Sequence, residues 1–230
     1  QKQMSIDQEI SGAEIILEAL KDQEVDTIFG YPGGAVLPIY DALFGQNFLK
    51  HVLVRQEAGA VHAAEGYARS SGKVGVLLVT SGPGVTNVVT GLTDALMDSI
   101  PIVCFSGQVP SHLIGTDAFQ ECDTTGITRP CTKHNYLVKD ITKLPEIIHE
   151  AFEIARSGRP GPVLIDIPKD IQFAKSVYKK KRDVTFKSHR IKSGSKDIDR
   201  GFIEKLIHHI KKSQKPVFYV GGGCLNSGCL

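Results

Sequence analysis

Glu57 is the side chain whose position could support acid–base chemistry. A short apolar strand over residues 51–55 precedes it, and Glu57 then opens a helix rich in alanine and glycine. Parallel α/β sheets bind ligands beyond the carboxyl ends of their strands, so this carboxyl should lie at the ligand edge. A carboxyl held there away from water suits a group that shares a proton. The alternative is a surface acid that only stabilises the first turn of its helix, and the spacing alone favours that alternative.

Glu65, two turns along the same helix, competes for this role, but its side chain should point away from the strand end. Three glycine-rich turns also follow strands and could cradle a ligand against helix N-termini. None of them matches a standard phosphate-binding motif, and each taken singly could be an ordinary loop. The turns are Gly30-Tyr31-Pro32-Gly33-Gly34, Ser81-Gly82-Pro83-Gly84 and Gly107-Gln108-Val109-Pro110.

The composition excludes several classes of protein. The 230 residues are 41% hydrophobic and 23% charged, which indicates a folded chain rather than a disordered or coiled-coil one. A formal charge of +2 gives no strong field for nucleic acid or a membrane surface. Five cysteines without a C-x-x-C pair argue against disulfides and structural zinc and favour a reducing, cytoplasmic location. No apolar run approaches the ~20 residues of a membrane span.

Apolar runs alternate with helical patterns along the first 170 residues, which predicts an α/β fold with a doubly wound, mostly parallel six-stranded sheet. Continuous apolar runs at residues 74–79 and 102–105 indicate strands buried on both faces. The pattern predicts strands at residues 27–29, 51–55, 74–80, 102–106, 136–138 and 163–167. It predicts helices beginning at Ser11, with a capping box to Glu14, and at residues 57–70, 84–97 and 145–157.

A second unit should follow the first. We expect one domain over residues 1–186, then a linker and the start of another α/β domain over residues 187–230. A helix at 198–211 and a strand at 216–220 would open it. The basic run 178–182 fits a solvated connector better than a nucleic-acid patch. Because the chain starts with Gln1 and stops within a glycine-rich apolar stretch, we interpret it as a fragment.

Long segments resemble one enzyme family. Residues 30–43, 55–69 and 80–87 closely resemble the N-terminal half of the acetohydroxyacid (acetolactate) synthase catalytic subunits, which use thiamine diphosphate. The resemblance continues through residues 115–121, 132–136 and 158–170, and so covers essentially the whole chain. The segment around Glu57 fits many thiamine-diphosphate enzymes, whereas residues 115–121 and 132–136 indicate the synthases.

The resemblance implies roles for individual residues. Glu57 would hydrogen-bond N1′ of the cofactor's aminopyrimidine and relay a proton. Gly34 and Gln120 would join it as catalytic residues, with Phe119 beside Gln120, although Phe119 could instead be a core residue. The remaining thiamine-diphosphate contacts would be Pro32, Gly33, Pro83 and Asn87. The substrate channel would be lined by Pro110, Ala118, Phe119, Lys133 and Lys169, with an exposed solubilising lysine as the alternative for Lys169.

The resemblance also implies cofactors and partners. FAD would contact Ser99 and Arg159, although Arg159 could be an ordinary arginine at a helix end. Mg²⁺ would be held by a Gly-Asp-Gly…Asn segment, and no Gly-Asp dipeptide occurs here, so we expect no metal ligand in this chain. The active site would form between two chains of a homodimer or homotetramer, with a small regulatory subunit. This sequence alone should therefore be inactive.

The implied activity is decarboxylation of pyruvate and its addition to pyruvate or 2-ketobutyrate, in the cytoplasm or in a eukaryotic organelle. The product would be 2-acetolactate or 2-aceto-2-hydroxybutyrate, on the route to branched-chain amino acids. Two alternatives stay open. One is a different thiamine-diphosphate enzyme, such as a 2-ketoacid decarboxylase or pyruvate oxidase. The other is a non-catalytic α/β ligand- or partner-binding module.

Overall fold

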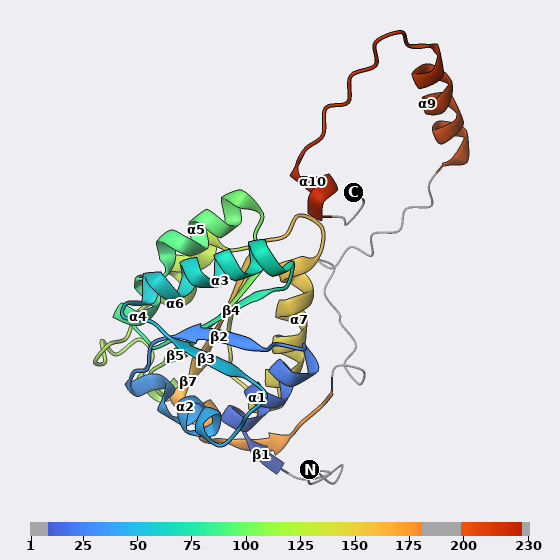
Figure 1. Ribbon diagram of the computed structural model, residues 1–230. Helices are drawn as coiled ribbons and strands as arrows, with labels where there is room; N and C mark the ends of the chain where they lie inside the picture. Colours follow the sequence, from blue (N-terminus) through green and yellow to red (C-terminus); the bar gives the residue numbers. More distant parts are fainter. Residues whose placement is uncertain (1–8, 181–198, 227–230) are drawn as a thin grey trace. The chain divides into compact units, whose positions relative to one another are not determined.

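A computed structural model describes residues 9–180 and 199–226, which fall into two compact units (Figure 1). The first unit comprises residues 1–190 and the second residues 191–230. The expected boundary at residues 186–187 and the basic, serine-rich linker after it lie outside the described residues, so the boundary stays a prediction.

Six parallel strands form the central sheet of the first unit, in the order β3-β2-β4-β5-β7-β6. The predicted doubly wound α/β fold is confirmed. The central strands β4, β5 and β7 are buried at every residue, as their largely apolar sequences predict. The strands are β2 (Thr27–Gly30), β3 (Lys50–Leu53), β4 (Gly75–Val79), β5 (Ile102–Gln108), β6 (His134–Leu137) and β7 (Pro162–Pro168).

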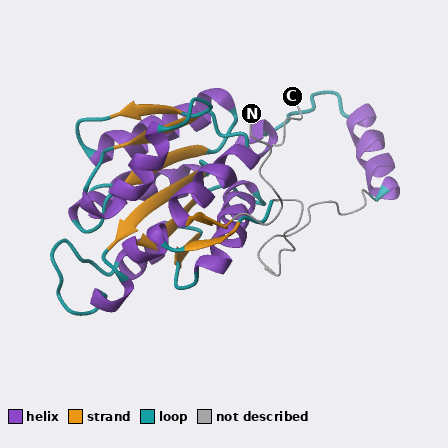
Figure 2. Ribbon diagram, turned by 90° about the horizontal axis from the view of Figure 1, so that it is seen from below, coloured by secondary structure: helices purple, strands orange, loops and turns teal. Residues whose placement is uncertain are grey.

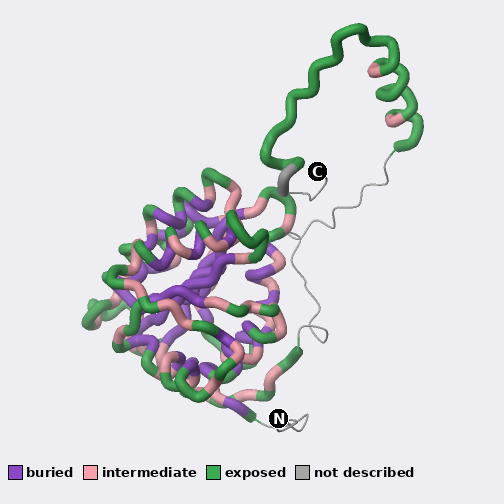
Figure 3. The backbone as a smooth tube through the Cα atoms, in the orientation of Figure 1, coloured by how far each residue is buried: buried purple, intermediate pink, exposed green. Residues whose placement is uncertain are grey.

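Helices cover both faces of this sheet (Figures 1 and 2). On one face α3 (Glu57–Ser71) packs against β4 and against α5 (Val89–Asp98). On the other, α1 (Gly12–Asp22) packs between α2 (Leu37–Phe44) and α7 (Leu144–Arg156). The central strands are therefore the most deeply buried part of the unit, seen as purple backbone in Figure 3, whereas the edge strands β3 and β6 contain no fully buried residue.

Local signals explain where the main helices begin. Ser11 and Glu14 form the predicted capping box, in which Ser11 N donates to Glu14 Oε2 over 2.8 Å and Glu14 N donates to Ser11 Oγ over 3.2 Å. At the start of α3, the Gln56 side chain accepts a hydrogen bond from Ala58 N over 2.7 Å. This contact satisfies one of the free amides at the helix end and places Glu57 in the first turn.

Several features of the first unit differ from the sequence-based expectation, which contained no helix at α2 and placed the strand of β6 at 136–138. The helix expected over 84–97 is broken into α4 (Pro83–Thr86) and α5, and Asn87 lies at the break. In addition, β1 (Glu9–Ser11) pairs antiparallel with β8 (Lys175–Val177) in a small second sheet. Both strands are three residues long, too short for an alternating pattern to identify them.

The second unit contains α9 (Arg200–Lys212) and α10 (Gly222–Asn226). Asp199 caps α9 by accepting a hydrogen bond from Gly201 N over 2.9 Å. The strand expected over 216–220 is wrong, because these residues adopt no regular structure and the described part of the unit offers no second strand for pairing. No described helix in either unit combines the length and the apolar character that a membrane span requires.

Candidate active site at the carboxyl edge of the sheet

Glu57 and Asn87 meet at the carboxyl edge of the sheet. Glu57 is the first residue of α3, a short turn after β3 ends at Leu53, and Asn87 occupies the break between α4 and α5. Asn87 Nδ2 donates a hydrogen bond to Glu57 Oε2 over 2.9 Å. Glu57 is half-buried, so its other oxygen remains available at this edge. The chain thus presents an oriented carboxyl where α/β sheets bind ligands.

Thr80 brings two of the glycine-rich turns together. It follows β4 and is 6% exposed. A Cβ on Gly33 would lie 2.5 Å from the Thr80 side chain, and a Cβ on Gly84 would lie 2.7 Å from Thr80 Cγ2. Both turns therefore need glycine because the backbone passes directly over this threonine. The would-be Cβ of Gly84 is also 3.7 Å from Glu57 Oε1, which joins Glu57 to the same cluster.

Gly34 has open space beside it. A Cβ on this residue would meet no atom within 4 Å, in contrast to Gly33. Pro32, in the same turn, and Pro83, the first residue of α4, are both exposed. The predicted thiamine-diphosphate contacts therefore surround an accessible region at the edge where Glu57 lies.

Gln120 belongs to a loop that packs onto the second glycine turn. Gly82 has φ +54°, and a Cβ there would lie 2.5 Å from the Gln120 carbonyl oxygen. Gln120 itself has φ +58°, a left-handed conformation that is uncommon outside glycine and clusters at functional sites. Ala118 is half-buried, whereas Phe119 is 87% exposed, so its alternative role as a core residue is wrong for the described chain.

Glu121 closes this loop. Its carboxylate accepts a hydrogen bond from Ala118 N over 3.0 Å and another from Gly115 N. These backbone donors, that of Gly115 most strongly, lower the pKa of Glu121. The loop's conformation therefore depends on an ionised carboxylate that the sequence did not single out.

A buried polar network lies beneath the loop, centred on Asp166 of β7, which is 1% exposed. Ser106 Oγ donates to Asp166 Oδ1 over 2.7 Å, and Gln108 Nε2 donates to Asp166 Oδ2 over 2.9 Å. Gln108 Nε2 also donates to the Cys122 carbonyl over 3.1 Å, which anchors the end of the loop. Burial raises the pKa of Asp166 to about 7, although the hydrogen bonds from Ser106 and Gln108 oppose the shift.

Comparison with known proteins agrees with this arrangement. Residues 10–127 match the family described as thiamine pyrophosphate enzyme, N-terminal TPP binding domain. The chain belongs to this family. Among curated relatives, the chloroplastic acetolactate synthase of Arabidopsis thaliana is 52% identical over 221 residues, which are 96% of this chain and 33% of that protein.

Two further relatives come from a bacterium and a yeast. The acetolactate synthase isozyme 3 large subunit of Escherichia coli K12 is 51% identical over 96% of this chain and 38% of its own length. The mitochondrial acetolactate synthase catalytic subunit of Saccharomyces cerevisiae is 51% identical over 94% of this chain and 32% of its own length. The chain thus spans about a third of the length of the curated relatives it matches.

Two predicted channel residues of this thiamine pyrophosphate enzyme domain follow neighbouring strands at the same edge. Pro110 follows β5, and Lys169 opens α8 (Lys169–Phe173) directly after β7. The two segments are joined because Ser111 N donates to Asp170 Oδ1 over 2.9 Å, and Ser111 Oγ donates to the same oxygen over 3.1 Å. Lys169 is half-buried rather than fully exposed.

Lys133 lies toward the other edge, because it precedes the first residue of β6. Its ammonium donates to the Ser157 carbonyl over 2.8 Å and to the Ile154 carbonyl, at the C-terminal end of α7. Burial lowers the pKa of Lys133. In this chain the charge of Lys133 faces helix carbonyls, and its channel role stays a prediction.

Ser99 and Arg159, the residues expected to contact FAD, also lie at the amino edge, in segments that precede β5 and β7. Arg159 Nε donates to Ser99 Oγ over 2.8 Å, and Nη2 donates to the Met97 carbonyl over 2.6 Å. These bonds cap the C-terminal end of α5 and not that of α7, the helix that precedes Arg159 in the sequence. The structure therefore brings the two residues together, but on the edge opposite Glu57.

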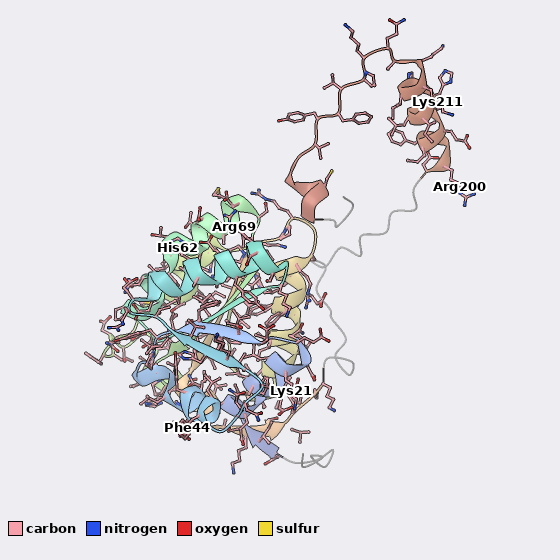
Figure 4. The ribbon with its side chains drawn as sticks, viewed as in Figure 1. Lys21, Phe44, His62, Arg69, Arg200 and Lys211 are labelled. Atoms are coloured by element: carbon pink, nitrogen blue, oxygen red, sulfur yellow. The ribbon has the colours of Figure 1, made fainter. Side chains whose placement is uncertain are left out.

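Glu65 faces α5 rather than the carboxyl edge, as expected. It is 4% exposed, and its Oε2 lies 2.7 Å from His62 Nδ1. Burial raises the pKa of Glu65, and the contact with His62 opposes this. His62, Glu65 and Asp94 are the one group in the described residues whose metal-ligand atoms gather within 4.8 Å of one another, and they lie on α3 and α5. Figure 4 labels His62 and Arg69 on α3.

Sequence reasoning missed the residues that support the site. Thr80, Gln108, Asp166 and Gln172 are buried polar side chains in or beside apolar strands. A polar residue within an otherwise apolar buried strand, such as Asp166 in residues 163–167, is a signal that could have identified one of them, since such groups need partners. Their partners lie far away in the sequence, so the pattern could not show what they hold.

Proposed function

We propose that this chain is the pyrimidine-binding part of an acetolactate synthase catalytic subunit. Such an enzyme decarboxylates pyruvate and joins the product to a second 2-ketoacid, pyruvate or 2-ketobutyrate. The observation that carries the proposal is the Glu57–Asn87 hydrogen bond beside the glycine turn at Gly84, in a chain about half identical to acetolactate synthases from plant, bacterial and yeast sources.

The described residues fit thiamine diphosphate. Gly34 is exposed, with no atom within 4 Å of where its Cβ would be, and Glu57 offers a carboxyl oxygen at the same edge, so both would be accessible to the cofactor. When bound, the cofactor supplies the electron sink that allows a 2-ketoacid to lose carbon dioxide. Glu57 would hold a proton at the pyrimidine nitrogen N1′, and Asn87 would fix the orientation of the Glu57 carboxylate.

The loop of residues 115–121 would form the side of the site where the ketoacid enters. Gln120 would direct its polar side chain toward the reacting end of the cofactor, while the exposed ring of Phe119 would exclude water once covered. Lys169, Pro110 and Ala118 would lie along the substrate's path, with the Lys169 ammonium attracting the ketoacid carboxylate.

The other cofactors depend on parts of the protein beyond these contacts. A magnesium ion needs several oxygen ligands, and the described carboxyl edge gathers no such group, so we propose that another segment of the longer protein holds Mg²⁺. FAD would approach Arg159 at the amino edge. The capping bonds of Arg159 use Nε and Nη2, so donors on Nη1 would serve FAD.

The proposal includes an assembly. The site is open at Gly34 and at the exposed Phe119, and a second catalytic subunit would cover it in a homodimer or homotetramer. The E. coli relative is named a large subunit, which supports a small regulatory subunit as a further partner. Relatives named chloroplastic and mitochondrial support an organellar location if the source is eukaryotic, and a cytoplasmic one otherwise.

Product analysis tests the proposal. A full-length catalytic subunit containing this sequence, supplied with thiamine diphosphate, Mg²⁺ and pyruvate, should form 2-acetolactate, and 2-aceto-2-hydroxybutyrate when 2-ketobutyrate is added. Acetaldehyde as the main product would identify a decarboxylase, and acetyl phosphate an oxidase. Either product, or no turnover at all, would overturn the synthase assignment.

A further inference from the structure

Gln172 binds the backbone beside the first glycine turn, residues 30–34, although it lies 137 residues from Ala35 in the sequence. It lies in α8 and is fully buried. Its Nε2 donates to the Ala35 carbonyl over 2.7 Å and to the Ile167 carbonyl over 2.9 Å. We infer that Gln172 is a positioning residue for the reaction, because it fixes the turn that presents Gly34 to the cofactor. This inference rests on the proposed function.

The turn is held from several sides. Ala35 N donates to Thr80 Oγ1 over 3.3 Å, so both backbone polar groups of Ala35 bind buried side chains from distant elements. A Cβ on Gly107 would lie 2.6 Å from both the Ala35 carbonyl oxygen and Val36 Cγ1. The turn therefore packs directly against β5, and it has no room to relax on that side.

Gly34, unlike its neighbours in the turn, is not closely packed. It lies one residue before Ala35, and nothing approaches within 4 Å of where its Cβ would be. The contacts of Gln172 and Thr80 thus immobilise the neighbouring residue while Gly34 stays open at the ligand edge. A rigid backbone beside an open space is the arrangement that orients a bound group before the reaction begins.

The orientation of the Gln172 amide follows from its partners. Both partners are carbonyl oxygens, so the NH₂ group must face them and Oε1 must face the other way. Gln172 Oε1 is buried and has no hydrogen-bond partner among the described residues. An unpaired buried acceptor is costly. An apolar side chain of similar size would avoid that cost, so the value of glutamine here lies in its two donors.

The test compares variants in a full-length catalytic subunit. Gln172→Met removes both donors at similar size, and Gln172→Glu keeps one donor while its carboxyl is protonated. The control is His149→Met. His149 is fully buried in α7 and forms part-buried hydrogen bonds with Gln23 and Tyr178, so this variant removes hydrogen bonds that do not involve the turn at Gly34.

We expect Gln172→Met to lower kcat by about 10- to 100-fold while the KM for pyruvate changes less than about threefold. The kcat of Gln172→Glu should lie between that of Gln172→Met and that of the wild type. His149→Met should lower the melting temperature comparably and leave kcat within about twofold of wild type. A kcat for Gln172→Met no lower than that of His149→Met would overturn the inference. If Gln172→Met does not fold, an unchanged kcat in Gln172→Glu would overturn it instead.

A second readout separates this inference from the proposed function. The kcat comparison uses whichever product the wild-type enzyme forms from pyruvate, so a product other than acetolactate overturns only the synthase assignment. If the wild-type enzyme is inactive, the rate of hydrogen exchange at the Ala35 amide tests the positioning role of Gln172 instead. Exchange should be faster in Gln172→Met than in the wild type and in His149→Met, and equal rates would overturn the positioning role.

Discussion

Asn87 Nδ2 donates a hydrogen bond to Glu57 Oε2 over 2.9 Å, across 30 residues of sequence, from the end of α4 to the start of α3. Asn87 is the residue at which the helix expected over 84–97 breaks, between α4 and α5. The chain itself thus supplies a donor that orients the carboxyl of Glu57 at the ligand edge.

Replacing Glu57 tests its proton role. Glu57→Gln keeps the size of the side chain and an acceptor for Asn87 but removes the acid. Turnover by the full-length enzyme should fall by roughly 10²–10⁴, since that range is typical for the loss of a general acid–base group. Glu65→Gln is the matched control, because Glu65 lies on the same helix and faces α5. A larger loss of turnover in Glu65→Gln than in Glu57→Gln would contradict our assignment.

Alanine substitutions at the adjacent Gly33 and Gly34 should affect different properties: Gly33→Ala should lower stability, and Gly34→Ala should lower turnover. Gly34→Ala places a methyl group where no atom lies within 4 Å, so the free energy of unfolding should change by less than about 1 kcal/mol while turnover falls. Gly33→Ala places its methyl group 2.5 Å from the Thr80 side chain and should destabilise the fold by about 1–3 kcal/mol. Urea denaturation and steady-state kinetics measure the two effects. Full activity in Gly34→Ala would exclude a ligand from that space.

The fold was largely predictable from the sequence because its signals are local. The capping box at Ser11 and the unbroken apolar runs of β4 and β5 each specify an element within a few residues. The site was predictable to the extent that its residues follow strands, as Glu57 does. The residues that hold it, such as Thr80 and Gln172, act through contacts up to 137 residues away, and no local pattern records such contacts.

The sequence-based predictions of secondary structure were wrong where strand pairing or tertiary packing determines the structure. The apolar run 216–220 has the composition of a strand, but a strand needs a partner, and none lies in the described part of that unit. Helical spacing over 84–97 did not reveal the break at Asn87, because residues on both sides of it keep the periodicity of a single helix.

Asp166 should make folding stability depend on pH. Burial raises its pKa from 3.8 to about 7, so between these pH values the folded chain retains a proton that the unfolded chain has released. Its contribution to the free energy of unfolding should therefore fall as pH rises from about 4 to about 7, by at most about 1.4 kcal/mol per pH unit, and should be constant above that range. Asp166→Asn lacks this ionisation. Urea denaturation at several pH values should show wild type losing stability relative to Asp166→Asn across the window, and a constant difference would contradict the raised pKa.

Arg159 allows the structural and cofactor roles to be separated. Its bonds to Ser99 Oγ and the Met97 carbonyl cap α5, so Arg159→Ala should lower the free energy of unfolding by about 1 kcal/mol without FAD present. Arg69→Ala is the control, because Arg69 forms an exposed ion pair with Asp98, a type of contact that contributes at most about 1 kcal/mol. If Arg159 also contacts FAD, Arg159→Ala should weaken FAD binding to the full-length enzyme by about tenfold. Flavin fluorescence measures this affinity. If FAD affinity is unchanged while stability falls, Arg159 caps the helix and the FAD contact must come from elsewhere.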